Sequence, residues 1–461
     1  MSLSVEYPDQ GSPSFPPGFQ WGVATASFQV EGATQERGAS IWDSFCRLPG
    51  RILDGSSGQV ACDHYHRFPE DVAMMVELGL SAYRFSIAWP RVLPLGYGRV
   101  NTVGLDFYDR LIDALCAAGI QPVPTLYHWD LPQALSDAGG WLSRDTAERF
   151  GDYARLVVDR FGDRVPRWIT LNEPFVHMAF GYAFGVHAPG QALMLDALPV
   201  AHHQLLAHAR ASEVLRAAGH EVLLTNNCTP VSPVDDAPDT VAAAAAYDTL
   251  HNRLFLDPLL LGEYPDLSAY ADPETGRTPL DRVIRDGDLA ALRGSVDALG
   301  VNYYNPTLAA APAPGDALPF ALPDYTELFP ETPLTGFGWP VVPDGLHALL
   351  TSLRDRYGPA LPPVHITENG CSYPGEPDAN GVVADPDRVA YLDGHLRALA
   401  EAIADGVDVR GYYAWSLLDN FEWAQGYTQR FGLVHVDFAT QARTPKESFF
   451  WYRDAIARAR G

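Results

Sequence analysis

The chain has 461 residues, of which 47% are hydrophobic, and a formal net charge of −25. This length fits one large α/β domain or two or three average ones, with enough apolar residues for a sizeable core. Because a strongly acidic surface repels polyanions, the charge argues against nucleic acid and anionic membranes as partners.

No run of about 18 apolar residues predicts a membrane span, and residues 1–17 show neither a basic start nor an apolar stretch. We therefore expect no signal peptide. An odd number of scattered cysteines without a C-x-x-C pair favours reduced thiols in a cytoplasm over a disulfide framework or a zinc site. They are Cys46, Cys62, Cys116, Cys228 and Cys371.

Short apolar runs alternate with helical patterns along the whole chain, and eight of these runs read as strands. They span residues 20–25, 82–87, 121–126, 167–171, 221–226, 298–303, 364–368 and 409–415. Apolar residues at i, i+3 and i+4 predict helices between them, for example at 69–79, 104–119, 144–162 and 385–406. This rhythm predicts a single-domain (β/α)8 TIM barrel over residues 1–461, with long loops at 311–345 and 371–381.

Active sites of such barrels lie at the C-terminal ends of the strands, so polar residues there are the candidates for a functional site. The strand ends and the segments after them carry Gln29, Glu31, Arg84, His128, Trp129, Asn172, Glu173, Asn302, Tyr304, Glu368, Trp415, Glu422 and Trp423. Polar side chains together with indoles suit a polyhydroxylated ring, whose hydroxyls need hydrogen bonds while its C–H face packs on aromatic rings.

Glu173 and Glu368 stand out because each ends a strand and is followed by a break, "NEP" and "ENG". A single glutamate at a strand end is more often a solvated surface residue than a catalyst. Two of them fit glycoside hydrolysis, which needs one protonated and one ionised carboxyl group. Arg84 could keep one carboxylate ionised, and Tyr304 could donate a hydrogen bond to it.

Several long motifs occur in one order across nearly the whole chain, roughly residues 15–455. They are "FQWGVATASFQVEG" (19–32), "YRFSIAWPRVLP" (83–94), "TLYHWDLPQ" (125–133), "TLNEP" (170–174), "GVHAPG" (185–190), "GVNYYNP" (300–306), "GWPVVPDGL" (338–346), "ITENG" (366–370) and "WSLLDNFEWAQGYTQRFGLVHVDF" (415–438). On these motifs the chain resembles glycoside hydrolase family 1, the β-glucosidase family of retaining enzymes.

The resemblance implies a retaining exo-β-glucosidase that acts on a small β-glucoside or oligosaccharide, with β-galactosides or β-fucosides as further substrates. It implies Glu173 as acid/base and Glu368 as nucleophile, with the two carboxyl groups about 5 to 5.5 Å apart. Arg84, Asn302 and Tyr304 would orient and tune the nucleophile. Glycone contacts would come from Gln29, His128, Trp129, Asn172, Asn302, Tyr304, Trp415, Glu422, Trp423 and Phe431, and aglycone contacts from His187 and Trp339.

The resemblance implies neither a metal nor an organic cofactor, and it allows a homo-oligomer. The histidines in "DHYHRF" (63–68) and "HH" (202–203) are accordingly expected to pack within the fold rather than to bind metal. Phe175 stands where the family often has Trp, which leaves the aglycone preference open.

Three alternatives remain. A 6-phospho-β-glycosidase is disfavoured because Glu422 would repel a phosphate. A catalytically inert sugar-binding relative would be expected to lack one of the two glutamates. A transglycosylase uses the same carboxylates and differs only in how well water competes with an acceptor.

Overall fold

The computed structural model of the chain describes residues 13–460, so the N-terminal segment considered for a signal peptide lies largely outside the described residues. Eight parallel strands close into a barrel in the order β1-β10-β9-β7-β5-β4-β3-β2. Their bounds are β1 Gln20–Ala24, β2 Ala82–Ser86, β3 Gln121–Tyr127, β4 Arg167–Asn172, β5 Glu221–Asn227, β7 Ala298–Asn302, β9 Val364–Asn369 and β10 Val409–Trp415. Each coincides with a predicted strand to within about one residue at either end.

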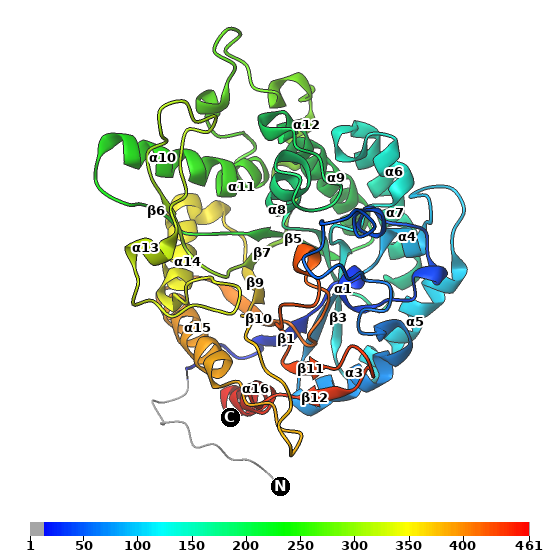
Figure 1. The fold of residues 1–461 in the computed structure, drawn as a ribbon. Coiled ribbons are helices and arrows are strands. Elements are labelled where there is room, and N and C mark those ends of the chain that lie inside the picture. The colour runs from blue at the N-terminus through cyan, green and yellow to red at the C-terminus, as the bar shows by residue number, and fades with distance from the viewer. Residues whose placement is uncertain (1–12, 461) are drawn as a thin grey trace.

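Helices follow the strands and form an outer ring around the barrel (Figure 1). The long ones are α3 His64–Leu78, α5 Thr102–Ala117, α7 Arg144–Phe161, α9 Leu198–Ala217, α10 Pro238–Asp248, α14 Pro343–Tyr357, α15 Pro386–Ala404 and α16 Glu447–Arg460. The C-terminal helix α16 lies beside α3 and α15, so the last helix of the chain closes the ring next to the first of the long helices. The (β/α)8 barrel prediction is confirmed.

The strands are buried on both faces, as expected when a parallel sheet is covered by helices outside and packed side chains inside. In β2 and β9 every residue is buried. Helix packing fills the outer layer, where Trp89 stacks on Tyr153 of α7 at a ring separation of 5.1 Å. No helix within residues 13–460 is long and apolar enough to cross a membrane.

Long loops follow several strands at the C-terminal end of the barrel. The loop after β7 contains β8 Thr307–Ala309, which pairs with β6 Val231–Pro233 from the loop after β5. The loop after β4 begins with the helical segments α8 Pro174–Val176 and η3 His177–Ala183. A small antiparallel pair, β11 Val434–Val436 and β12 Arg443–Pro445, follows β10. These loops build the walls above the strand ends.

Strand register brings the strand-end residues together. Asn227 of β5 pairs with Asn302 of β7, and Asn302 pairs in turn with Glu368 of β9. Register shifts lie close by, between Val301 and Asn302 and between Ile169 and Asn172. Such irregularities re-aim side chains near the end of a ladder, and here they occur where polar side chains converge.

Candidate active site

Glu173 is buried at the end of β4, and its backbone is in the left-handed region with φ 48°. That conformation is costly for a residue with a Cβ and persists only where surrounding contacts hold it. The Glu173 N–H donates to Thr225 O at 2.8 Å, while Glu173 Oε1 accepts from Asn302 Nδ2 at 2.8 Å and Asn227 Nδ2 at 3.2 Å. Burial, reinforced by the nearby Glu368 carboxyl, raises the pKa of Glu173 to about 8.

Glu368 is the penultimate residue of β9 and has stronger partners than Glu173. Arg84 Nη1 lies 2.6 Å from Glu368 Oε1, and the Tyr304 hydroxyl donates to Glu368 Oε2 at 2.7 Å. Burial raises the pKa of Glu368, while Arg84, Tyr304 and the Asn302 amide act against that rise. Arg84 thus opposes protonation as expected, although burial outweighs it. The two carboxyl groups sit in different environments, one beside a cation and one beside amides.

Asn172 links both carboxyl groups. Its Oδ1 accepts from Arg84 Nη2 at 2.5 Å and from Asn302 Nδ2 at 3.1 Å. Its Nδ2 is a donor and lies 3.1 Å from Nε2 of His128, so Nε2 must accept the hydrogen bond. Burial holds the pKa of His128 well below its usual range, so the ring is neutral and its proton lies on Nδ1. His128 Nδ1 has no partner among the described residues and is a donor ready for a hydroxyl.

A second group of polar atoms lies between the loop after β1 and the segment after β10. Gln29 Nε2 donates to Phe421 O at 3.0 Å and reaches Glu422 Oε2 at 3.4 Å. Gln29 Oε1 is buried and has no partner within residues 13–460. Burial and the charges of Glu368 and Glu173 raise the pKa of Glu422 to about 8. Glu422 can therefore donate as well as accept a hydrogen bond near neutral pH.

Aromatic rings cluster beside these polar groups. Trp129 lies 4.7 Å from Trp423 between ring centroids, and His128 stacks against both Trp423 and Trp415 at 5.8 Å. Trp129 and Trp423, like Glu173, have positive φ values, 76° and 49°. A left-handed backbone is costly for such bulky residues, so the surrounding contacts must hold both in this conformation.

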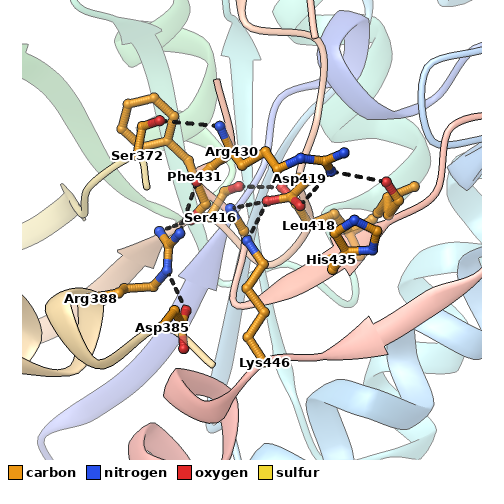
Figure 2. Close-up of polar contacts among 12 residues, drawn as sticks. Ser372, Asp385, Arg388, Ser416, Leu418, Asp419, Arg430, Phe431, His435 and Lys446 are labelled. Carbon is orange, nitrogen blue, oxygen red and sulfur yellow. Dashed lines mark hydrogen bonds and ion pairs between the residues drawn. The ribbon is translucent and has the colours of Figure 1, made fainter. Parts of the chain in front are cut away.

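A buried charge network surrounds Asp419, three residues before Glu422 in the chain (Figure 2). Asp419 Oδ1 accepts from Lys446 Nζ at 2.7 Å and from the Gly432 N–H at 2.9 Å, while its Oδ2 lies 3.0 Å from Arg430 Nη1. Arg388, paired with Asp385 at 2.7 Å, donates to Phe431 O at 3.1 Å. These contacts join residues 419, 430–432 and 446, so they fix the base of the loop after β10.

A cavity of about 540 Å³ opens over the strand ends. The predicted residues that line it are His128, Trp129, Glu173, His187, Tyr304, Trp339, Glu368, Trp415, Glu422, Trp423 and Phe431. The other predicted site residues lie directly beside this lining, each hydrogen-bonded to a lining residue. Gln29 contacts Glu422, Arg84 contacts Glu368, Asn172 contacts His128 and Asn302 contacts Glu173.

The positions of some residues differ from what the sequence predicts. Glu31 lies outside the cavity lining, where its carboxylate pairs with Arg91 at 2.8 Å and accepts from Tyr108 at 2.7 Å. Asn227, which donates to Glu173, was missed although it directly follows the predicted strand 221–226. The apolar walls from the loops after β4 and β7 were also missed, because nothing in their local pattern relates them to the strand ends.

The histidines considered as metal ligands make contacts within the fold. His64 Nδ1 lies 2.7 Å from Asp71, His202 Nε2 lies 2.9 Å from Asp288, and His203 Nδ1 lies 2.9 Å from Trp141 O. Among the described residues, no group of three or more His, Cys, Asp or Glu side chains could hold a metal ion.

Comparison with known proteins decides the family. The family described as glycosyl hydrolase family 1 matches residues 12–460. The chain belongs to this family. It is 43% identical over 448 residues to β-glucosidase A of Thermotoga maritima, covering 96% of this chain and 97% of the relative. It is 44% identical over 471 residues to a bifunctional β-D-glucosidase/β-D-fucosidase of Bifidobacterium breve, covering 96% and 98%.

Solved structures of the family share the fold. The crystal structure of a psychrophilic β-glucosidase from Micrococcus antarcticus matches with a TM-score of 0.92 and 44% identity, covering 97% of this chain and 98% of that one. The resemblance recognised in the motifs is therefore confirmed across the described barrel.

Proposed function

We propose that this family 1 member is a retaining exo-β-glucosidase that releases terminal non-reducing β-D-glucosyl residues. The observation that carries the proposal is the unlike pair of carboxyl groups at one cavity. Glu173, whose pKa is raised to about 8, suits a general acid, and Glu368, held by Arg84 and Tyr304, suits a nucleophile. The relatives named β-glucosidase support the substrate.

In the first step, a Glu368 carboxylate oxygen attacks the anomeric carbon while the Glu173 carboxyl gives its proton to the leaving glycosidic oxygen. The C–O bond to the aglycone breaks, and the sugar becomes esterified to Glu368. As the Glu368 carboxylate loses its charge, its attraction to Arg84 weakens. The positive charge of Arg84 then favours the departure of Glu368 as a carboxylate in the second step.

In the second step, Glu173 is a carboxylate and takes a proton from water as the water oxygen attacks the anomeric carbon. The ester bond to Glu368 breaks, and glucose leaves with its β configuration retained. Asn302 and Asn227 both donate to Glu173 Oε1, so they stabilise the carboxylate form needed here. A raised pKa opposed by amide donors suits a group that alternates between acid and base.

For the glycone, we propose that the unpaired atoms Gln29 Oε1 and His128 Nδ1 bind sugar hydroxyls together with Glu422. Asn172 would meet the 2-hydroxyl, and the rings of Trp129, Trp415, Trp423 and Phe431 would pack on the sugar. The B. breve relative named as a β-D-fucosidase as well as a β-D-glucosidase supports β-fucosides as second substrates. β-Galactosides have less support as further substrates than β-fucosides.

The phosphorylated alternative is disfavoured by the charges of the cavity. Among the described residues, neither Lys nor Arg lines it, whereas Glu173, Glu368 and Glu422 do. A sugar 6-phosphate would lack the cation that phosphates usually find in protein sites. A protonated Glu422 would not repel the phosphate by charge, but it would supply no cation for it either.

For the compartment, we propose a reducing one such as the cytoplasm. All five cysteines are free thiols, and Cys62, Cys228 and Cys371 are buried, where the pKa of each thiol is raised by burial. Buried protonated thiols of this kind are inert to disulfide exchange.

The test is release of nitrophenol from nitrophenyl β-glucoside, β-fucoside, β-galactoside and β-glucoside-6-phosphate by the wild type and Glu368→Ala. Turnover of the unphosphorylated glycosides that disappears in the variant supports the proposal and ranks the glycones. Turnover of the phosphorylated sugar alone would overturn the substrate, and equal turnover by Glu368→Ala would overturn the nucleophile.

A further inference from the structure

The outer part of the cavity differs in chemistry from its floor. The ionised or ionisable acids that line it are Glu173, Glu368 and Glu422, all at strand ends or after β10. The wall above them comes from the loops after β4 and β7, and it is mostly apolar. Its members include Met178, Phe180, Phe184, Leu318, Phe320 and Leu322.

The rim of this wall exposes large apolar side chains to solvent. Phe180, Phe184, Val186, Met194 and Leu322 all line the cavity, and each is between 38% and 50% exposed. Clustered exposed apolar residues on a chain with a net charge of −25 mark a binding surface rather than ordinary surface composition. Because they are continuous with the catalytic carboxyl groups, their occupant is whatever is attached to the bound sugar.

Several polar groups in the outer part are already satisfied within the protein, whereas His187 Nδ1 is buried without a partner among the described residues. Thr229 Oγ1 lies 2.9 Å from Thr307 Oγ1 and donates to Asn305 O at 3.0 Å, and Asn305 Nδ2 donates to Pro306 O at 3.0 Å. Asn227 Nδ2 donates to Glu173, and its Oδ1 lies 3.1 Å from His251 Nε2. Apart from His187 Nδ1, these groups offer no free partner, so a hydroxyl-rich aglycone would lose hydration here for few matched hydrogen bonds.

The histidines of this region carry no charge. Burial lowers the pKa of both His187 and His251 to about 4. His251 stacks on Phe175 at a ring separation of 3.9 Å, and His187 lies 5.3 Å from Phe180. Both therefore act as flat aromatic surface near neutral pH, so the outer wall offers no counter-charge to an ionic aglycone.

We infer that the preferred substrates are glucosides of bulky, uncharged apolar alcohols, alkyl or aromatic, rather than short β-linked gluco-oligosaccharides. This inference rests on the proposed β-glucosidase function and adds the class of the leaving alcohol. Phe180, Phe184 and Leu322 determine this specificity by covering apolar surface of the aglycone, and they have no part in the bond-breaking step.

The test measures kcat/KM for glucose release from methyl, butyl, hexyl and octyl β-glucoside and from cellobiose, at micromolar concentrations where octyl glucoside is monomeric. Simple n-alkanols are nearly equal leaving groups, so a trend along the series reports aglycone binding rather than bond reactivity. Each fully buried methylene is worth roughly a fourfold gain. We expect octyl glucoside to exceed both butyl glucoside and cellobiose by at least about tenfold.

Phe184→Ser tests the apolar wall itself. Phe450→Ser on α16 is a matched control, because Phe450 is similarly exposed, 36% against 46% for Phe184, and lies outside the cavity lining. Phe184→Ser should lower the octyl-to-methyl ratio of kcat/KM at least about threefold, and Phe450→Ser should leave that ratio unchanged. A flat alkyl series, a preference for cellobiose, or equal ratios in the two variants would each overturn the inference. Glucose release from none of the glycosides would instead overturn the proposed function, and this inference with it.

Discussion

Arg84 Nη1 lies 2.6 Å from Glu368 Oε1, so a cation from β2 reaches across the barrel to a carboxylate near the end of β9. Both side chains are almost fully buried, and the same guanidinium donates to Asn172 Oδ1 and Thr367 O. Charge-assisted hydrogen bonds of this kind are the strong ones in proteins. The pair therefore favours the ionised form of Glu368 against the cost of its burial.

Arg84→Met should lower kcat/KM for nitrophenyl β-glucoside by roughly thirtyfold or more, since a charge-assisted bond is worth about 2 kcal/mol. Without the cation the pKa of Glu368 rises further, so the acidic limb of the pH profile moves to higher pH. Arg354→Met, which removes an exposed ion pair with Asp355, is the control and should change neither quantity. An unmoved acidic limb in Arg84→Met would contradict the assigned role.

The pH profile should also have an alkaline limb near pH 8, because the pKa of Glu173 is raised to about 8 and the acid must be protonated for the first step. Activity on methyl β-glucoside is expected to fall as the pH rises through that value. Glu422, whose pKa is also raised to about 8, could produce a similar limb. Glu422→Gln separates the two, because the limb should persist in that variant if Glu173 causes it.

Glu173→Gln provides the complementary evidence. Methyl β-glucoside needs a proton on its leaving oxygen, so its kcat/KM should fall at least about a hundredfold. The release of dinitrophenol from dinitrophenyl β-glucoside in the first turnover should fall far less, because that leaving group departs without a proton. Equal losses on the two substrates would show that Glu173 is not the acid.

Lys446 and Asp419 form the centre of the buried network in Figure 2, with Nζ 2.7 Å from Oδ1. Removing Lys446 leaves Asp419 buried with Arg430 as its remaining ion-pair partner, and breaking a buried pair in this way costs about 3 kcal/mol of unfolding free energy. We expect that loss for Lys446→Met in urea unfolding, together with a higher KM for glucosides because the base of the Glu422 loop loosens. Arg453→Met, which breaks an exposed pair with Asp454, should cost less than about 1 kcal/mol. Similar stabilities of the two variants would contradict this view.

Asp130 next to Trp129 provides a test of stability against pH. Burial raises its pKa to about 7, its Oδ2 accepts from Ser27 Oγ at 2.8 Å, and its Oδ1 has no partner among the described residues. A carboxyl whose pKa is higher in the folded state stabilises the fold fully below its unfolded value. That contribution is lost as the pH rises through the folded value.

Relative to the wild type, Asp130→Asn should therefore gain about 4 kcal/mol of unfolding free energy between pH 4 and pH 8. Any cost of the new amide is the same at both pH values and cancels in this comparison. Asp152→Asn on the exposed face of α7 should show no such change relative to the wild type. A difference between Asp130→Asn and the wild type that stays constant from pH 4 to pH 8 would show that the Asp130 carboxylate is not destabilising.

Much of the fold was predictable because a barrel repeats one local pattern. Each strand is a short apolar run, and the break after Glu173 or Glu368 marks a strand end by itself. The same rule could have found Asn227. It also placed Glu31 among the site candidates, because a strand end does not reveal that Arg91, sixty residues later, neutralises that carboxylate.

The apolar wall could not be predicted from the local pattern. Phe184 and Leu322 belong to different loops and come together only because β4 and β7 are held at a fixed distance by the barrel. The raised pKa of Glu368 could not be predicted from the sequence either. Arg84 alone would lower it, and only the extent of burial shows that desolvation outweighs the cation.

The proposed double displacement is tested most directly by peptide mapping with mass spectrometry after inactivation with 2-deoxy-2-fluoro-β-D-glucosyl fluoride, which slows the second step more than the first. We expect one fluoroglucosyl group per chain, attached to Glu368. A label on Glu173 or Glu422, or turnover without any covalent adduct, would contradict the double displacement through Glu368.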